Sequence, residues 1–380
     1  MERGNIKVSD KLDVKGWSVE SLYILMWKNQ MFVNRRYQRK LVWNLEENQL
    51  FIDSLLSKYP VPSIILSEYE VKIDDDIDDN YEIIDGLQRL NAIALFMRCK
   101  FPIKYNEEYM YYDLNYCPGA AELVTKGKLE QPTPVLPFEV CNAIRYAQIP
   151  VVVTMQRKER IEKIELIFNR INSQGRKLSS HDIRQANNID LFADLVRRVA
   201  TSIRGDYTYD DRIAILDMPK ISLRSNGLDY GIDPESSFWI RHGFFLFNNF
   251  RQSKDEELLA GTMAMCLLGE NFHVNARNLN IIYDSNSKLS QKINKIVEAA
   301  GRDVLEKEFF DIIIEIDNIF TSVHSNFSQY LFEMLKRQIK IFVFLPCFLL
   351  YIAYTRKDLL LLIQSALQKH LKSIANQHLV

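Results

Sequence analysis

Residues 81–89 of this chain read Tyr-Glu-Ile-Ile-Asp-Gly-Leu-Gln-Arg, and their types and order suit the binding of phosphate. An apolar strand ends in a carboxylate and a glycine, and we expect a helix over Leu90–Met97 directly afterwards. A helix N-terminus carries unpaired N–H groups and a partial positive charge, which favour phosphates. Gly86 allows a ligand close to the backbone, and Arg89 supplies a planar fork for phosphate oxygens. The alternative is an ordinary strand-to-helix turn with Arg89 on its solvent face.

A second polar segment lies about fifty residues earlier and interleaves basic and aromatic side chains. It reads Arg35-Arg36-Tyr37-Gln38-Arg39-Lys40-Leu41-Val42-Trp43. Such a mixture suits contacts with phosphates and bases, because arginine brings charge and an aromatic ring brings a stacking face. Arg35, Arg36 and Lys40 are therefore candidate DNA contacts. An alternative of equal weight is that this segment is a solvent-exposed stretch after a strand, with Trp43 in the core.

A third segment, residues 168–178, places two asparagines and two arginines at the end of an amphipathic pattern. Asn169 and Asn172 are polar enough to line a site. Taken alone, however, their pattern is more typical of a helix C-terminus and the turn after it, where Gly175 has the position of a C-cap glycine.

The first half of the chain must position these segments with a mixture of strands and helices. Proline and glycine punctuation and the apolar spacing predict helices over 17–27 and 45–56 and strands over 31–33, 63–69, 81–84 and 149–155. The acidic run at 74–79 reads as a solvated hairpin loop, and metal binding there is the lesser alternative. Residues 102–137 hold five prolines and little periodicity, which indicates an ordered loop insertion.

After about residue 156 the pattern becomes almost wholly helical. Ser179 and Asp182 have the spacing of a capping box. Helices are expected over 160–171, 190–203, 236–250, 255–268, 288–299, 303–322 and 326–370. The fold class is therefore α+β, with a mixed first domain over 1–155 and an α-helical domain over 156–380.

Composition favours a globular protein in a reducing compartment. The 380 residues carry a formal net charge of -1, and 47% are hydrophobic, so two ordinary cores can form. The five cysteines are scattered and odd in number, which argues against a disulfide framework. The N-terminus has no signal-peptide pattern, and the apolar run at 341–354 is too short for a membrane span of about 20 residues. We expect a cytoplasmic protein with no membrane association.

Several common catalytic sites are absent from the sequence pattern. There is no Walker A loop, because Gly175-Arg176-Lys177-Leu178 lacks the required spacing and hydroxyl. The six histidines form no metal-ligand pair at a strong spacing, and no HNH-like nuclease cluster is visible. A stand-alone, metal-dependent nuclease that uses carboxylates such as Asp85 is therefore the least favoured function.

The three polar segments together resemble the N-terminal domain family of GmrSD-type restriction endonucleases, which is itself similar to the ParB/sulfiredoxin-like superfamily. The resemblance rests on "RRYQRKLVW" followed by "IDSLLSKYPVPSIIL", on "YEIIDGLQRLNAIALF" and on "IFNRINSQGRKLSSHDIRQA", in that order, and covers about residues 15–270. The stretch "SKDEELLAGTMAMCLLG" is a weaker similarity.

The resemblance implies a ParB-like head in which the Asp-Gly-Gln-Gln-Arg turn binds, and in relatives hydrolyses, a nucleoside triphosphate with Mg²⁺. It also implies a role in bacterial DNA restriction or anti-phage defence. Carried over, the catalytic candidates are Asp85, Gln88 and Arg89, with Asp85 as the weak candidate for the metal. The implied nucleotide-binding residues are Arg36, Tyr37, Gln38, Arg39, Asp85, Gly86, Gln88, Arg89, Asn169 and Asn172.

Two departures from the family pattern leave alternatives open. Position 87 is leucine where the family usually has glutamine, so either hydrolysis is impaired or this side chain points into the core. The family's HNH-type nuclease half is not recognised after residue 270, so cleavage of DNA would come from a partner nuclease. The alternative to a nucleotide-dependent switch is a non-catalytic DNA-binding or protein-interaction module of the same fold. DNA is an expected partner in both cases, and a homo-oligomer is left open.

Overall fold

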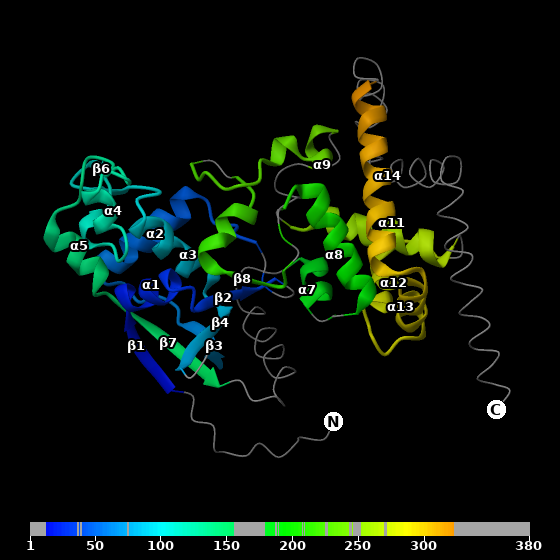
Figure 1. Ribbon diagram of the computed structural model, residues 1–380, viewed down its shortest axis with the longest axis horizontal. Coiled ribbons are helices and arrows are strands. Elements are labelled where there is room, and N and C mark those ends of the chain that lie inside the picture. Colours follow the sequence, from blue (N-terminus) through cyan, green and yellow to red (C-terminus); the bar gives the residue numbers. More distant parts are fainter. Residues whose placement is uncertain are drawn as a thin grey trace. The chain divides into compact units, whose positions relative to one another are not determined.

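A mixed six-stranded sheet and a set of packed helices form two separate units of the chain (Figure 1). The computed structural model describes residues 13–322, with gaps at 36–37, 39, 74–75, 156–178, 187, 189, 207, 209, 225–226, 243–244, 246–251 and 270–271. The first unit comprises residues 1–177 and 210–231, and the second comprises 178–209 and 232–380. The segment 210–231 therefore belongs to the first unit, although the chain on both sides of it belongs to the second.

The sheet of the first unit has the strand order β1-β7-β3-β4-β2-β8. The strands are β1 (Asp13–Ser18), β7 (Gln148–Met155), β3 (Ile64–Ile73), β4 (Asp76–Asp85), β2 (Met31–Asn34) and β8 (Arg212–Ala214). Strand β2 pairs in parallel with β4, while β3 pairs antiparallel with β4 and in parallel with β7. Because β2 and β4 run in the same direction, the residues that follow both strands leave the sheet at the same edge.

Three helices lie on one side of this sheet, namely α1 (Val19–Trp27), α2 (Leu45–Leu56) and α3 (Leu87–Met97) (Figure 1). Helices α1 and α2 begin with side-chain caps from Ser18 and Asn44, and the latter forms a complete capping box with Glu47. In α3 every residue except Arg89 is buried, which makes this helix the centre of the first core. A helix buried on all sides needs apolar residues around its whole circumference, and apart from Asn91 the sequence from Leu90 to Met97 supplies them.

The region between α3 and β7 contains short elements. These are β5 (Ile103–Tyr105), β6 (Glu108–Met110), the 3-10 helix η1 (Leu114–Tyr116), α4 (Ala121–Thr125) and α5 (Phe138–Arg145). Tyr112 and Leu136 are buried in the core of the first unit. The expected loop insertion is therefore ordered, as predicted, but it also contains regular structure that the sequence pattern did not reveal.

The described part of the second unit is helical. Its elements are α7 (Ser180–Ala186), α8 (Leu191–Arg204), the 3-10 helix η3 (Pro234–Ser236), α9 (Phe238–Arg241), α11 (Lys254–Leu268), α12 (Ala276–Ile282), α13 (Lys288–Ala300) and α14 (Arg302–Ser322). Helix α8 packs against α11, α13 and α14 through a buried apolar face that includes Leu195, Val196 and Val199. This composition of a mixed sheet unit and a helical unit confirms the α+β class.

Most expected elements of the first unit are present, but two boundaries are wrong. Residues 76–79 of the acidic run lie in β4, where Asp76 pairs with Ile73, so the hairpin exists but its loop is shorter than expected. Main-chain ladder bonds do not depend on the side chains that the strands carry, which explains why pairing continues through this acidic sequence. The helix expected at Leu90 begins at Leu87, directly after Gly86.

In the second unit the capping box is confirmed, because the backbone N–H groups of Ser179 and Asp182 each donate to the other's side chain at 3.0 Å. The helix expected over 236–250 begins at Phe238 and ends at Arg241 with His242 as its C-cap, so its expected extent is wrong; residues 243–244 and 246–250 lie outside the described residues. Helix α12 was not expected. The helices expected over 160–171 and 326–370 lie outside the described residues. Within the described part of the chain, no helix has the length and apolar character that crossing a membrane requires.

Candidate functional site

The turn between β4 and α3 has an unusual backbone that only glycine adopts easily. Gly86 has φ 99°, which is the left-handed region, and serves as the N-cap of α3. A Cβ atom at this position would lie 2.9 Å from Cγ1 of Ile64. Among the described residues no side chain caps the helix, so the N–H groups of its first turn are not satisfied by a capping side chain. The glycine is therefore required by the backbone, and no side chain occupies the capping position at the start of α3.

Arg89 is fixed against the carboxylate that ends the strand. Its Nη2 atom donates to Oδ2 of Asp85 at 2.6 Å and to the carbonyl oxygen of Ser63 at 3.1 Å. The side chains of Arg89 and Asp85 are 13% and 31% exposed. Nε of Arg89 is buried and has no hydrogen-bond partner among the described residues. The turn thus holds a cation and a reachable carboxylate one helical turn apart, and one guanidinium donor is unused.

Gln88 is engaged by the protein itself. Its Oε1 atom accepts from the backbone N–H groups of Val42 and Trp43 at 3.0 and 3.1 Å, and its Nε2 atom donates to the carbonyl oxygen of Lys40 at 3.2 Å. The residue is 9% exposed. In this arrangement the amide fixes residues 40–43 against the start of α3, and its role is to position the second polar segment.

Leu87 lies in the hydrophobic core and is 4% exposed. Of the two alternatives that this position left open, the structure supports the one in which the side chain points into the core. A glutamine here would bury an amide among apolar side chains, which is unfavourable without partners. In this chain the side chain at position 87 does not contribute a polar group to the turn.

The second polar segment leaves β2 beside the end of β4, as the parallel pairing of these strands requires. The Nε2 atom of Gln38 donates to the carbonyl oxygens of Ile83 and Ile84 at 3.0 and 2.6 Å. The backbone N–H of Arg35 donates to the carbonyl oxygen of Asp211 at 2.7 Å. The structure therefore brings Gln38 to the Asp85 end of β4. The candidate residues Arg36, Tyr37, Arg39, Asn169 and Asn172 lie outside the described residues.

Trp43 belongs to the core rather than to an exposed stacking platform. Its ring packs at 5.7 Å from the ring of Phe51, with the planes tilted by 55°. Trp43 is partly buried and packs against the main core cluster. This geometry favours the alternative in which Trp43 fills the core.

Two buried polar contacts near the turn were missed in the sequence. Glu82 is 3% exposed, and its carboxylate accepts from Nδ2 of Asn34 at 3.2 Å and from Nη2 of Arg212 at 2.8 Å. Asn91 is 1% exposed and donates from Nδ2 to the hydroxyl of Tyr230 at 3.0 Å. The available signal was a single polar residue inside an otherwise apolar strand or helix, because such a residue needs a buried partner. Arg212 and Tyr230 both come from the segment 210–231.

The second unit contains a dense cluster of buried charged groups. Arg204 at the end of α8 donates from Nε to Oδ2 of Asp255 at 2.6 Å and from Nη2 to Oδ1 at 2.5 Å. Its Nη1 atom donates to Oε1 of Glu256 at 2.5 Å. These carboxylates lie at the N-terminus of α11 and the guanidinium lies at the C-terminus of α8, so the helix dipoles favour both. The cluster joins these two helices.

His181 on α7 lies beside this cluster. Its Nε2 atom is 3.8 Å from Oε2 of Glu256, and its ring packs edge-on against Tyr283 at 5.6 Å. Burial lowers the pKa of His181 below its usual range, although Glu256 and Asp182 oppose this effect. Nδ1 of His181 has no hydrogen-bond partner among the described residues. A neutral, tightly enclosed imidazole is the result.

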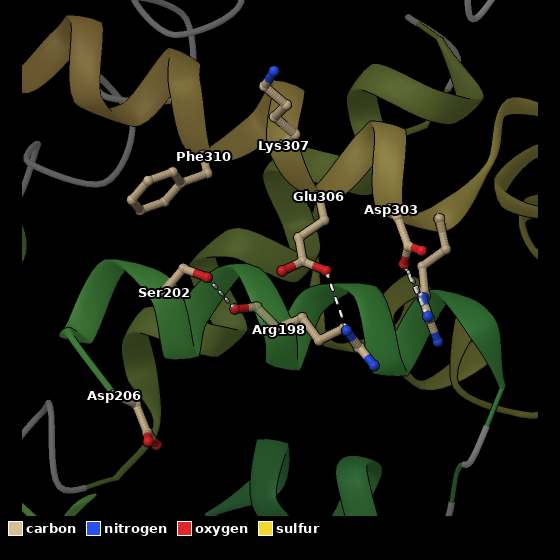
Figure 2. A pocket seen from close by; sticks show the side chains of 8 residues that line it. Arg198, Ser202, Asp206, Asp303, Glu306, Lys307 and Phe310 are labelled. Atoms are coloured by element: carbon tan, nitrogen blue, oxygen red, sulfur yellow. Dashed lines mark hydrogen bonds and ion pairs between the residues drawn. The ribbon is translucent and has the colours of Figure 1, made fainter. Parts of the chain in front are cut away.

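A hollow of about 480 Å³ lies between α8 and α14 in the second unit (Figure 2). Its lining residues are Arg198, Ser202, Asp206, Arg302, Asp303, Glu306, Lys307 and Phe310. Arg198 pairs with Glu306 at 3.5 Å, and Arg302 pairs with Asp303 at 2.9 Å. Since these carboxylates neutralise both guanidinium groups, the hollow is not a strong anion site.

The comparisons with known proteins identify part of the chain. Residues 22–189 match the family described as GmrSD restriction endonuclease, N-terminal domain. For this part of the chain the match confirms the resemblance seen in the sequence. The match ends at residue 189, short of the limit near residue 270 that the motifs suggested. A search of curated proteins found none that matches the chain.

Proposed function

We propose that this protein is a nucleotide-dependent component of a bacterial DNA restriction or anti-phage defence system, and that the Asp85–Arg89 turn binds the phosphates of a nucleoside triphosphate. The association with restriction rests on the family match over residues 22–189. The nucleotide site rests on one observation in particular. Asp85, Gly86 and Arg89 lie together at the start of α3, beside the exit of β2.

Each group of the turn has a separate role in this proposal. The N–H groups of the first turn of α3 and the guanidinium of Arg89 bind phosphate oxygens, and Gly86 lets the phosphates reach the backbone. The Arg89–Asp85 pair holds both side chains at the turn before the ligand arrives. Arg35 and Lys40, the described basic residues after β2, would add positive charge near the turn.

The residues present fit a magnesium ion that arrives with its nucleotide. The part of the chain that the structure describes has no group of three His, Cys, Asp or Glu residues that could hold a metal ion. A nucleotide-bound Mg²⁺ keeps phosphate and water ligands and needs only one or two carboxylates from the protein. Asp85 is the carboxylate that would supply this ligand, and the ion would neutralise phosphate charge.

The position of Gln88 favours a second candidate, which is a binding module without turnover. Hydrolysis needs a group that orients the attacking water. The amide of Gln88 is bound to residues 40–43, and Leu87 lies in the core. In this second candidate the domain retains nucleotide or DNA binding, and DNA contacts by Arg35, Arg36 and Lys40 would weaken steeply with salt.

A binding and hydrolysis panel separates these candidates. ATP, GTP, CTP and UTP are titrated with and without Mg²⁺, and hydrolysis is measured with and without DNA. The proposed function predicts Mg²⁺-dependent binding of at least one nucleotide, and it predicts that Asp85→Asn reduces the benefit of Mg²⁺. Binding with no hydrolysis under any condition supports the module without turnover. Absence of binding for all four nucleotides at millimolar concentration contradicts the proposed site.

A further inference from the structure

The segment 210–231 supports both ends of the β4–α3 turn, although it lies far from the turn in sequence. Before the turn, Arg212 on β8 donates to the carboxylate of Glu82 at 2.8 Å. After the turn, the hydroxyl of Tyr230 accepts from Asn91 at 3.0 Å. Between these contacts the 3-10 helix η2 (Ile215–Ile221) buries Ile215, Met218 and Ile221 in the first core. The segment is therefore an integral part of the first unit.

The carboxylate of Glu82 connects the two strands from which the candidate ligand groups emerge. Glu82 lies on β4, three residues before Asp85, and one of its oxygens accepts from Asn34 at the end of β2. Its other oxygen accepts from Arg212, which is also the register partner of Asn34 in the β2–β8 pair. A carboxylate that is 3% exposed needs such partners, because burial of an uncompensated charge is costly.

The same region fixes the backbone that leads into the second polar segment. The backbone N–H of Arg35 donates to the carbonyl oxygen of Asp211 at 2.7 Å, and the backbone N–H of Gln38 donates to the carbonyl oxygen of Asn34 at 3.0 Å. Gln38 in turn reaches the end of β4 through its side chain. Asn34, Arg35 and Gln38 are thus held from both sides, by β4 and by the segment 210–214.

We propose that Arg212 is a positioning residue of the nucleotide site, which acts through Glu82 and Asn34 to hold Arg35 and Gln38 beside the Asp85–Arg89 turn. This inference rests on the proposed function for its ligand, but its structural part can be tested without one. The chain on both sides of 210–231 belongs to the helical unit. Arg212 therefore lies in a segment of the first unit that is connected at both ends to the helical unit.

Hydrogen exchange of the free protein tests the positioning itself. Arg212→Ala removes a cation that contacts Glu82, so the amides of Arg35 and Gln38 should exchange roughly tenfold faster than in the wild type. Arg224→Ala is the matched control, because Arg224 lies in the same segment and pairs at 3.3 Å with the exposed Asp229. The control should leave these amides unchanged. Equal exchange in Arg212→Ala and the wild type overturns the proposal.

Nucleotide titration tests the functional consequence. Loss of a supporting residue behind a binding group commonly costs about tenfold in affinity, so Arg212→Ala should bind the Mg²⁺–nucleotide about tenfold more weakly. Arg212→Lys keeps the charge and should recover most of the affinity, and Glu82→Gln/Arg212→Ala should recover part of it because no buried charge remains. If Arg212→Ala binds the Mg²⁺–nucleotide as tightly as the wild type does, the inference is wrong. No binding in the wild type contradicts the proposed function, and the exchange result then decides the positioning role by itself.

Discussion

Nη2 of Arg89 lies 2.6 Å from Oδ2 of Asp85, one helical turn away across the junction of β4 and α3. The pair links the last residue of a strand to the first turn of a helix, and Gly86 between them has the backbone that this turn requires. Arg89 is therefore held at the helix N-terminus rather than extended into solvent. A short motif in the sequence becomes a fixed arrangement of a cation and a carboxylate at a helix N-terminus without a side-chain cap.

Replacement of Gly86 tests whether the turn depends on its backbone and on the space around it. Gly86→Ala should lower the free energy of unfolding by more than the about 1–2 kcal/mol that a left-handed alanine costs, because its Cβ would also meet Ile64 at 2.9 Å. Gly127→Ala is the control, since Gly127 also has a positive φ of 65° but has no atom within 4 Å of the added Cβ. Equal losses for the two variants in urea unfolding would show that the contact with Ile64 is unimportant.

Gln88 should behave as a structural residue. Gln88→Ala removes the oxygen that accepts from the N–H groups of Val42 and Trp43, and loss of such an acceptor costs about 1–3 kcal/mol. The exchange of amides at 42 and 43 should also increase. Gln49→Ala removes only one bond, from Nε2 to the carbonyl oxygen of Pro102 at 2.8 Å, and should cost less. A Gln88→Ala variant of wild-type stability that loses only nucleotide hydrolysis would instead assign Gln88 a catalytic role.

Leu87→Gln introduces the residue that the related motif usually carries. Because Leu87 is 4% exposed, the variant should lose about 2–4 kcal/mol of stability through lost apolar burial and an unpaired amide. Nucleotide hydrolysis should not increase. Leu50→Gln is a suitable control, as Leu50 is 65% exposed and its replacement should change stability by less than about 0.5 kcal/mol. A gain of hydrolysis without loss of stability would mean that position 87 faces the ligand.

Acidification should destabilise the helical unit through His181. Burial lowers the pKa of this imidazole in the folded state, so the unfolded state binds more protons as the pH falls below the ordinary value of 6.5. Stability contributed by the neutral imidazole is therefore lost as the pH falls from about 7 towards 5. The surrounding charged groups are Glu256 and Glu257 on α11 and Asp182 and Arg184 on α7.

Burial raises the pKa of Asp182, so protonation of this carboxyl favours the folded state as the pH falls, which is opposite to the effect of His181. Comparison with His181→Gln separates the two contributions, because Asp182 is present in both proteins. The wild type should lose more thermal stability between pH 7 and pH 5 than the variant does. Parallel pH profiles for the two proteins would contradict the assignment to His181.

The sequence was most informative where one local signal determines a structure. The apolar spacing of 45–56 and the prolines after it predict α2 to the residue, because both signals act within one helix. The glycine at position 86 likewise predicts the turn. Its effect on the helix start was underestimated, since a left-handed glycine lets α3 begin directly at Leu87.

Contacts between distant segments could not be predicted in the same way. Glu82 and Arg212 are 130 residues apart, and Asn91 and Tyr230 are 139 apart. Nothing in the local pattern of 210–231 shows that it joins the first unit, because its strand has only three residues and η2 is a 3-10 helix. The hydrogen bonds between Gln88 and the backbone of residues 40–43 could not be predicted for the same reason, because residue spacing does not indicate hydrogen bonds to a distant backbone.

Calorimetric titration of Arg89→Ala with a Mg²⁺–nucleotide tests most directly whether Arg89 at the start of α3 binds nucleotide phosphate. Arg98→Ala is the matched control, because Arg98 is the exposed C-cap residue of the same helix. Circular dichroism establishes that both variants are folded. We predict that Arg89→Ala weakens binding by about a hundredfold, since a charged hydrogen bond to phosphate contributes about 1.5–3 kcal/mol, while Arg98→Ala binds like the wild type. Wild-type affinity in a folded Arg89→Ala variant would contradict the account.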